Sequence, residues 1–342
     1  MINRLLIGLD GSNLAESALS YAERLGQAAR ADLLLVRAVP PEEASDVLDE
    51  VNPRWLPYMA AMPSTPPGSA TAPPHGVLHE AAAYLDAIGT RLNQRGLACQ
   101  AVAATGDAAD VLLEEAKELD ANLIVLGTHG RSVLGRWMHG SVAEAVLARS
   151  PVPVLLVRDG TTRTGTSAMR PLTSILVPLD GSPMAEAALP WAAELARLLS
   201  AELHLVRIVP PLVLVPGDEL QGVDVAAPVL AEDLDEGAAR AYLEDVAEPL
   251  RAQGLPTTSM VRTGHVAAEI VNAAEECDAG LIVMATHGRT GLARVLLGSV
   301  ALQVLHREHR PLLVVGPHAG SGAMAQHGPP SRRAQTAERK AS

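Results

Sequence analysis

Apolar residues along the chain follow two periods that alternate. Short runs of Val, Ile and Leu are separated by longer stretches in which apolar positions recur every three or four residues. In the first half the runs lie near 4–9, 33–38, 98–103, 122–127 and 153–157, and the helical stretches near 13–29, 77–95, 107–118 and 141–149. This alternation predicts a parallel sheet with crossover helices. The runs at 123–127 and 154–157 contain no polar residue, which is typical of strands buried on both faces.

The same pattern occurs twice. LLIGLDGS at 5–12 matches ILVPLDGS at 175–182, and LLLVRAVP at 33–40 matches LHLVRIVP at 203–210. The segment GTHGRSVLGRWMHGSV that begins at Gly127 matches ATHGRTGLARVLLGSV, which begins at Ala285. A repeat of this length predicts two whole domains and not the short units of a solenoid.

The repeat divides the chain into four parts. We place the domains at residues 1–158 and 172–317. The Thr- and Gly-rich stretch 159–171 is expected to be a linker. Residues 318–342 have scarcely any large apolar side chain and are expected to be a disordered tail. An insertion in the first copy contains the Pro-rich stretch 63–74, which cannot pack as a regular element.

Several helix starts carry recognisable signals. Ser182 followed by Pro183 predicts an N-cap with proline at the first position of a helix over 183–199. Ser141 with Glu144 fits a capping box. Ser299 retains the serine, but no glutamate follows at the matched position, so a weaker cap is expected there.

Two segments of each copy are expected to meet at the carboxyl ends of the strands, where open parallel sheets bind ligands. One carries Asp10 or Asp180 at the end of the first strand. The other is a glycine-rich loop that leads into a helix, with Gly127, Gly130 and Gly140 in the first copy. Glycines allow the backbone to come close to a phosphate. The start of a helix offers unpaired N–H groups and the positive end of the helix dipole. With an aspartate placed to accept from ribose hydroxyls, these features predict a mononucleotide site.

The loop spacing G-x2-G-x9-G-S, together with the LDGS strand end, resembles the nucleotide-binding signature of the universal stress protein family. The similarity covers nearly the whole chain and occurs twice. It implies two tandem Rossmann-like, adenine-nucleotide α-hydrolase-like α/β domains, each with a five-stranded parallel sheet and helices on both faces. It also implies that Asp10 and Asp180 contact the sugar, and that the backbone at Ala38 and Ile208 contacts adenine. The resemblance places the phosphates on Gly127, Gly130, Gly140, Ser141 and Val142, and in the second copy on Ala285, Gly288, Gly298, Ser299 and Val300.

The two copies differ at one position of this signature. Ala285 replaces the first glycine, and its methyl group either crowds the nucleotide or is harmless, depending on the local φ. An alternative role for Asp10 and Asp180 is to cap the following helix, as aspartate commonly does after a strand. The paired glycine loops favour binding over capping.

Composition and charge restrict the partners. The net charge of −12 disfavours nucleic acid and anionic membranes. No apolar run reaches the ~18 residues needed to span a bilayer. Cys99 and Cys277 are far apart and in no metal or redox spacing, so a cytoplasmic, disulfide-free protein is expected.

The motifs favour a binding protein over an enzyme. His129 and His287 lie in the loops without a carboxylate or serine at a spacing that suggests a general base. No GxxxxGK[ST], HExxH, CxxC or GxSxG motif is present, so efficient ATP hydrolysis is not predicted, and weak turnover stays open.

The leading hypothesis is a regulatory, stress-response protein that binds ATP, with or without Mg²⁺, and whose occupancy changes its protein partners or oligomeric state. One alternative is an interaction module that dimerises without nucleotide. Another is an enzyme that cleaves the α–β phosphate bond or transfers AMP. The resemblance further suggests pairing through the last strands, 152–157 and 311–315, either within the chain or in a homodimer.

Overall fold

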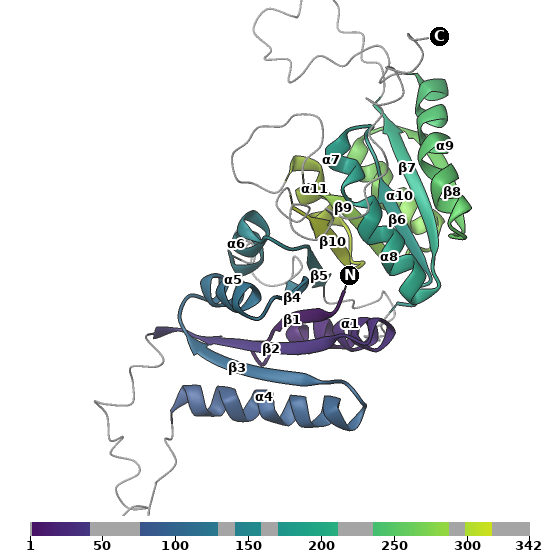
Figure 1. Cartoon of the computed structure of the whole chain (residues 1–342). Coiled ribbons are helices and arrows are strands. Elements are labelled where there is room, and N and C mark those ends of the chain that lie inside the picture. The colour runs from purple at the N-terminus through teal and green to yellow at the C-terminus, as the bar shows by residue number, and fades with distance from the viewer. Residues whose placement is uncertain are drawn as a thin grey trace, which may run out of the picture.

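The protein forms a single twisted sheet covered by helices on both faces. The computed structural model describes residues 2–41, 76–128, 141–158, 170–210, 235–286 and 298–316. Within these ranges ten strands make one sheet in the order β3-β2-β1-β4-β5-β10-β9-β6-β7-β8 (Figure 1). The predicted insertion and tail, and most of the linker, lie outside the described residues.

The elements repeat in the two halves of the chain. The first half contains β1 (Arg4–Gly8), α1 (Asn13–Ala29), β2 (Asp32–Val39), α4 (Val77–Gln94), β3 (Cys99–Thr105), α5 (Ala108–Glu118), β4 (Leu123–Thr128), α6 (Ser141–Arg149) and β5 (Val154–Arg158). The second contains β6 (Ser174–Pro178), α7 (Pro183–Glu186), α8 (Leu189–Leu199), β7 (Glu202–Val209), α9 (Glu236–Ala252), β8 (Thr257–Thr263), α10 (Val266–Glu276), β9 (Leu281–Ala285), α11 (Ser299–Arg307) and β10 (Leu312–Val315). The predicted class of two Rossmann-like α/β units is confirmed.

The two halves join through their last strands. Within each half neighbouring strands are parallel, whereas β5 and β10 pair antiparallel. Leu155 lies opposite Leu313 at the centre of this pair. Of the two arrangements expected for the last strands, the structure therefore has the pairing within the chain.

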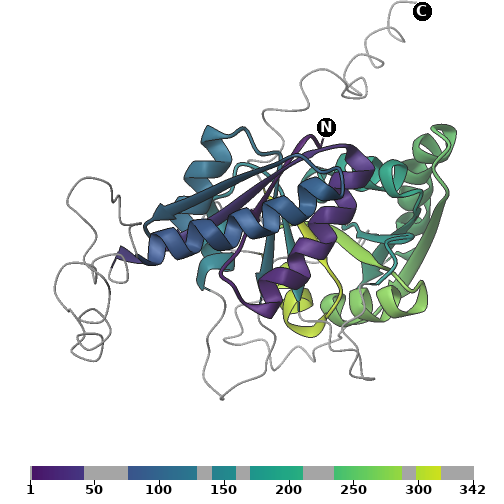
Figure 2. The same cartoon turned by 90° about the horizontal axis from the view of Figure 1, so that it is seen from below.

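The helices form two layers. α1, α4, α7, α8 and α9 cover one face, and α5, α6, α10 and α11 cover the other. Figure 2 shows α1 and α4 side by side on the face that is nearer in that view. Each layer packs on a core that includes residues of both halves, so the junction is part of the hydrophobic core on both faces.

Helix starts follow the sequence signals with one break. The Ser12 hydroxyl accepts a hydrogen bond from the Ala15 N–H. The predicted cap at Ser182 is confirmed, because its hydroxyl accepts a hydrogen bond from the Ala185 N–H. The expected helix over 183–199 is wrong, because it is divided into α7 and α8. Pro190 has no N–H and its ring clashes with the carbonyl four residues earlier, and α7 ends at that residue, Glu186.

The start of β9 packs tightly on the chain that precedes β6. A Cβ built on Gly280 would lie 1.9 Å from the carbonyl oxygen of Pro171. Arg170, just before this proline, donates its N–H to the Tyr21 hydroxyl of α1 (3.3 Å). Gly280 therefore allows the segment that enters the second half to pass close to the sheet.

Within the described residues, none of the helices combines the length and apolar character needed to cross a bilayer.

Gly280→Ala is expected to lower the free energy of unfolding by about 1–3 kcal/mol, because its methyl group meets backbone atoms that cannot move without displacing a strand. Gly89→Ala is the matched control. Gly89 lies in α4 with its nearest atoms 3.8 Å from an added Cβ, so alanine is expected to stabilise by about 0.5–1 kcal/mol. Urea unfolding measures both, and equal midpoints for the two variants would contradict this account of the junction.

Candidate functional site

A crevice is expected where the strand order reverses. In the first half this point is β1, which lies between β2 and β4. The chain leaves β1 for α1 on one face and leaves β4 for α6 on the other. The loops at the carboxyl ends of β1 and β4 therefore diverge, which is the arrangement in which open α/β sheets bind ligands. β6 and β9 have the same relation in the second half.

The register brings the predicted segments to one edge of the sheet. Gly8 pairs with Leu126, so Asp10 and Thr128 both lie two residues further along these neighbouring strands. In the second half Leu176 pairs with Ile282, which places Asp180 and Thr286 in the same relation. The aspartate of each copy and the beginning of its glycine loop therefore follow neighbouring strands at the same edge of the sheet.

Each aspartate braces a tight turn. Oδ1 of Asp10 accepts the N–H of Ser12 (2.8 Å), and Oδ1 of Asp180 accepts that of Ser182 (2.9 Å). The glycines between them, Gly11 and Gly181, have φ of 84° and 85°, a left-handed conformation that other residues rarely adopt. The cap of the following helix is the serine, so the alternative in which the aspartate caps it is wrong.

This division of roles leaves the Asp10 carboxylate available. Its side chain is exposed at the end of β1, and within the described residues Oδ2 forms no hydrogen bond or ion pair. A carboxylate oxygen held by a turn can accept from sugar hydroxyl groups. Asp180 is half-buried.

An arginine supports the glycine turn in both copies. The Arg37 guanidinium lies over the Tyr84 ring, 5.3 Å from its centroid, and Arg207 lies over Tyr242 at 5.1 Å. A Cβ built on Gly11 would meet Nη1 of Arg37 at 3.6 Å. For Gly181 and Nη1 of Arg207 the distance is 3.3 Å. The stacked arginines therefore pack behind the turns that hold the aspartates.

The two tyrosines differ in their hydroxyl groups. Tyr242 donates to Oε1 of Glu186 (3.0 Å), whereas the buried Tyr84 hydroxyl has no partner within the described residues. Burial raises the pKa of both phenols, and for Tyr242 the Glu186 carboxylate raises it further. Both rings therefore remain neutral at ordinary pH and suitable for cation–π contact.

Ala38 and Ile208 lie on the strands next to the aspartates. Ala38 pairs with Ala104, and Ile208 with Arg262. Both are half-buried towards the α5 and α10 face, opposite to their neighbours Arg37 and Arg207, because successive strand residues alternate. Their backbone is thus at the edge where the resemblance places adenine contact.

Gly127 has a packing reason to be glycine. A Cβ there would lie 2.8 Å from the carbonyl oxygen of Leu14 in α1, and its φ is not in the left-handed range. The second copy carries Ala285 at this position and has the divided helix α7 and α8 in place of α1. Since the conflict at Gly127 is with protein backbone, the methyl of Ala285 concerns helix packing and is not by itself evidence against a ligand.

The loop of the second copy ends in a helix with an open start. Gly298 is the N-cap of α11, with φ −53° and ψ 146°, and among the described residues no side chain caps the helix. The Gly298 N–H donates to the Thr286 carbonyl (2.7 Å), so the two ends of the loop are tied together. Ser299 is the first helical residue, and the expected serine cap there is wrong. The amides of Ser299 and Val300 are among those that an α-helix leaves without internal acceptors.

The first copy can be compared only in part. α6 also begins at its serine, Ser141. The next residue, Val142, is half-buried and packs against the core of that face. Gly130, Gly140 and Gly288 lie outside the described residues, as do the loop histidines and the side chain of Ser141. The capping box at Ser141 therefore stays a prediction.

The sequence interpretation missed the arginine–tyrosine pairs as part of the site. A signal was present, because Arg37 and Arg207, and Tyr84 and Tyr242, occupy matched positions of the repeat. Strand periodicity alone cannot show that a side chain on the opposite face folds back behind the turn.

Comparison with known proteins gives consistent results. The model of the universal stress protein family matches residues 1–158 and again 172–316. Universal stress protein Rv2005c of Mycobacterium tuberculosis is 30% identical over 195 residues, which span 57% of this chain and 62% of that protein's length. A universal stress protein of Mycolicibacterium smegmatis is 24% identical over 92% of this chain and 97% of its own.

Among solved structures, a universal stress protein from Archaeoglobus fulgidus has the same fold. It superposes with a TM-score of 0.66 at 19% identity and covers 92% of this chain and 99% of its own. With the family model matching most of the sequence in two successive segments, the chain belongs to the universal stress protein family, as a member with two tandem copies.

Proposed function

We propose that the protein is a stress-response regulator that binds ATP in the two crevices, with the phosphates at the starts of α6 and α11. The observation that carries this proposal is the arrangement of groups at Asp180 and Gly298. There, a turn-braced carboxylate and a helix start without a side-chain cap lie at the same edge of the sheet. An equivalent aspartate turn exists in the first half at Asp10.

The described groups suit the chemistry of a nucleotide. Carboxylate oxygens accept hydrogen bonds from ribose hydroxyls, and free helix amides with the positive end of the dipole attract phosphates. Uncapped amides are otherwise unfavourable unless water or a ligand meets them. ATP brings its own charge to a protein of net charge −12, so Mg²⁺ bound to the phosphates would lessen the repulsion.

The proposed role is binding and not catalysis. Within the described residues no group of three or more His, Cys, Asp or Glu side chains is arranged to hold a metal ion. The alternative is an interaction module that dimerises without nucleotide. Dimerisation through the last strands is less favoured, because β5 and β10 already pair with each other. A change of partners on nucleotide binding is the regulatory step that we propose.

Removing the aspartates tests the sugar contact. In isothermal titration, Asp10→Ala and Asp180→Ala are each expected to weaken ATP binding at one of two sites by about tenfold or more, the value of a charge-assisted hydrogen bond. Asp10→Asn keeps the oxygen that accepts the Ser12 N–H, so it should preserve stability and still lose affinity. Asp32→Ala, on an exposed residue at the start of β2, is the control. Wild-type affinity in both alanine variants would refute the assignment.

Ser299→Asp tests the phosphate contact. A carboxylate in the first turn of α11 favours the helix dipole by about 0.3–1 kcal/mol, so the variant should be as stable as wild type or more so. The same charge repels phosphates, so ATP affinity at the second site should fall at least tenfold. Ser299→Ala separates loss of the hydroxyl from gain of charge. If Ser299→Asp binds ATP as tightly as wild type, the phosphates are not at this helix.

Arg207→Met tests the support behind the turn. Arg207 is 8% exposed, and methionine keeps its apolar volume but loses the contact with Tyr242 and the packing behind Gly181. The free energy of unfolding is expected to fall by about 1–3 kcal/mol. ATP affinity at the second site should fall by a smaller factor than in Asp180→Ala. Arg240→Met, on an exposed position of the same helix as Tyr242, should change neither quantity.

A further inference from the structure

A cavity at the junction of the two halves is lined by cationic and polar side chains. It has a volume of about 610 Å³, within the range of small-molecule sites. Its described lining is Arg158 of β5 and residues in and after the last turns of α11: Gln303, His306, Arg307 and His309. In a chain of net charge −12 this is an unusual concentration of positive charge.

The cavity lies beside the loop edge of the first half. Arg158 pairs in register with Thr128, the last residue of β4 and the point from which the chain enters the first glycine loop. β10 runs antiparallel to β5, so the segment between α11 and β10 lies at the carboxyl end of β5. The second half therefore presents the end of α11 at the edge where we propose that the first half binds phosphates. Neighbouring strands are about 4.8 Å apart, so the backbone of Arg158 lies about one strand spacing from Thr128, where that loop begins.

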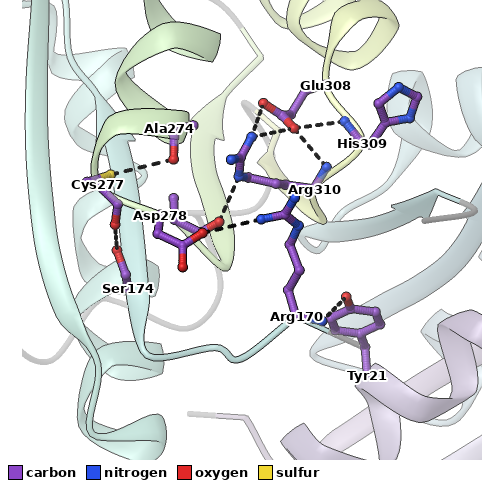
Figure 3. Close-up of polar contacts among 10 residues, drawn as sticks. Tyr21, Arg170, Ser174, Ala274, Cys277, Asp278, Glu308, His309 and Arg310 are labelled. Carbon is purple, nitrogen blue, oxygen red and sulfur yellow. Dashed lines mark hydrogen bonds and ion pairs between the residues drawn. The ribbon is translucent and has the colours of Figure 1, made fainter. Parts of the chain in front are cut away.

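The lining is held in a fixed arrangement. Nη1 of Arg158 donates to the carbonyls of Leu305 and, at 2.7 Å, Glu308, and the arginine is 6% exposed. Glu308 and Arg310 are both buried, and the carboxylate accepts two hydrogen bonds from Nη1 of this arginine at 2.8 and 2.9 Å. Figure 3 shows the ring of His309 directed away from this pair.

The Glu308 carboxylate is bound within the turn and does not pair with Arg307. Oε1 of Glu308 also accepts the N–H groups of His309 and Arg310, so its charge is committed to the turn and to the buried arginine. Arg307 is exposed, and within the described residues it forms no ion pair. Arg307 therefore brings an exposed positive charge to the cavity, with the exposed side chain of His309 beside it.

The matched surface of the first half lacks this charge. The residues that correspond to Arg158, His306 and His309 are Gly316, Ala148 and Pro151. Arg149 corresponds to Arg307, but it forms an ion pair with Asp110 (2.6 Å), and Ala268 stands where the second half would need that aspartate. The cationic cavity is thus a feature of one end of the junction, because it depends on differences that arose between the copies.

We propose that this cavity binds a chain of phosphate groups, so that the second half of the protein contributes cations to the phosphate end of the first half's site. This inference rests on the proposed function where the phosphates belong to a nucleotide in the first crevice. The same chemistry fits free inorganic polyphosphate, which would bind in the cavity alone. Arg307 and His309 are the exposed groups that contact the anion, and Arg158 fixes the wall between the halves.

The test uses the full chain with Asp180→Ala, to weaken the second site, in phosphate-free buffer. Titrations with ATP, AMP and inorganic tripolyphosphate compare this protein with one that also carries Arg307→Gln and His309→Gln. ATP and tripolyphosphate affinity are each expected to fall about three- to tenfold, while AMP affinity changes less than twofold. Arg149→Gln, the matched substitution in the first half, should leave all three unchanged. Urea unfolding checks that the exposed substitutions preserve the fold.

The possible results separate the two proposals. Equal weakening of ATP and AMP, or no weakening of ATP and tripolyphosphate, overturns the cationic cavity even if nucleotide binds. Binding of tripolyphosphate that depends on Arg307 and His309, without binding of ATP or AMP, overturns the nucleotide function and keeps the cavity as a polyphosphate site. Competition of tripolyphosphate with ATP and not with AMP supports one continuous site.

Discussion

The antiparallel pairing of β5 with β10 is the constraint on which the rest of the structure depends. Both strands are buried along their whole length, with apolar residues pointing to both faces. Left as edges, such strands would expose unpaired backbone and would promote association. Joining them removes both edges, and the outer strands become β3 and β8, whose residues are mostly half-buried or exposed. Burial and strand composition therefore agree on which strands are central.

This pairing also decides where the functional edges lie. The two halves are oppositely oriented because their shared strand pair is antiparallel, so the carboxyl edge of one half adjoins the amino edge of the other. The C-terminal end of α11 is consequently next to the end of β5, although the N-terminal end of α11 lies at the carboxyl edge of the second half. One short helix thereby takes part in both edges, its N-terminus in one and its C-terminus in the other.

Much of the fold could be predicted from the sequence because the determining features are local or repeated. Unbroken apolar runs identify central strands, and Ser12 and Ser182 place helix starts within a residue. The failures have equally local causes. Pro190 divides a helix whose apolar stripe continues through it, and Ser299 is a helical residue because Gly298 already provides the extended N-cap conformation.

The candidate site was less predictable because part of it depends on tertiary contacts between residues that are distant in the sequence. The position of Asp10 and Asp180 follows from the strand ends, and their bonds to Ser12 and Ser182 are local. The arginines packed behind these turns come from the neighbouring strands. Gly127 illustrates the same limit, since its lack of a side chain fits the signature and is required by Leu14. A glycine motif indicates where the backbone comes close to another group. The packing of the folded chain shows whether that group is a ligand or another part of the protein.

Duplication gave both halves one scaffold, but their sites have become physically different. The carboxyl edge of the first half is next to the cavity that Arg158 of β5 and the end of α11 line, whereas that of the second half is next to a surface whose arginine, Arg149, forms an ion pair with Asp110. Under the proposed function, a phosphate chain would therefore meet different potentials at the two edges. Under the proposed function, two sites that differ in charge would bind a nucleotide with different affinities. That asymmetry, more than the repeated fold, distinguishes the two proposed sites.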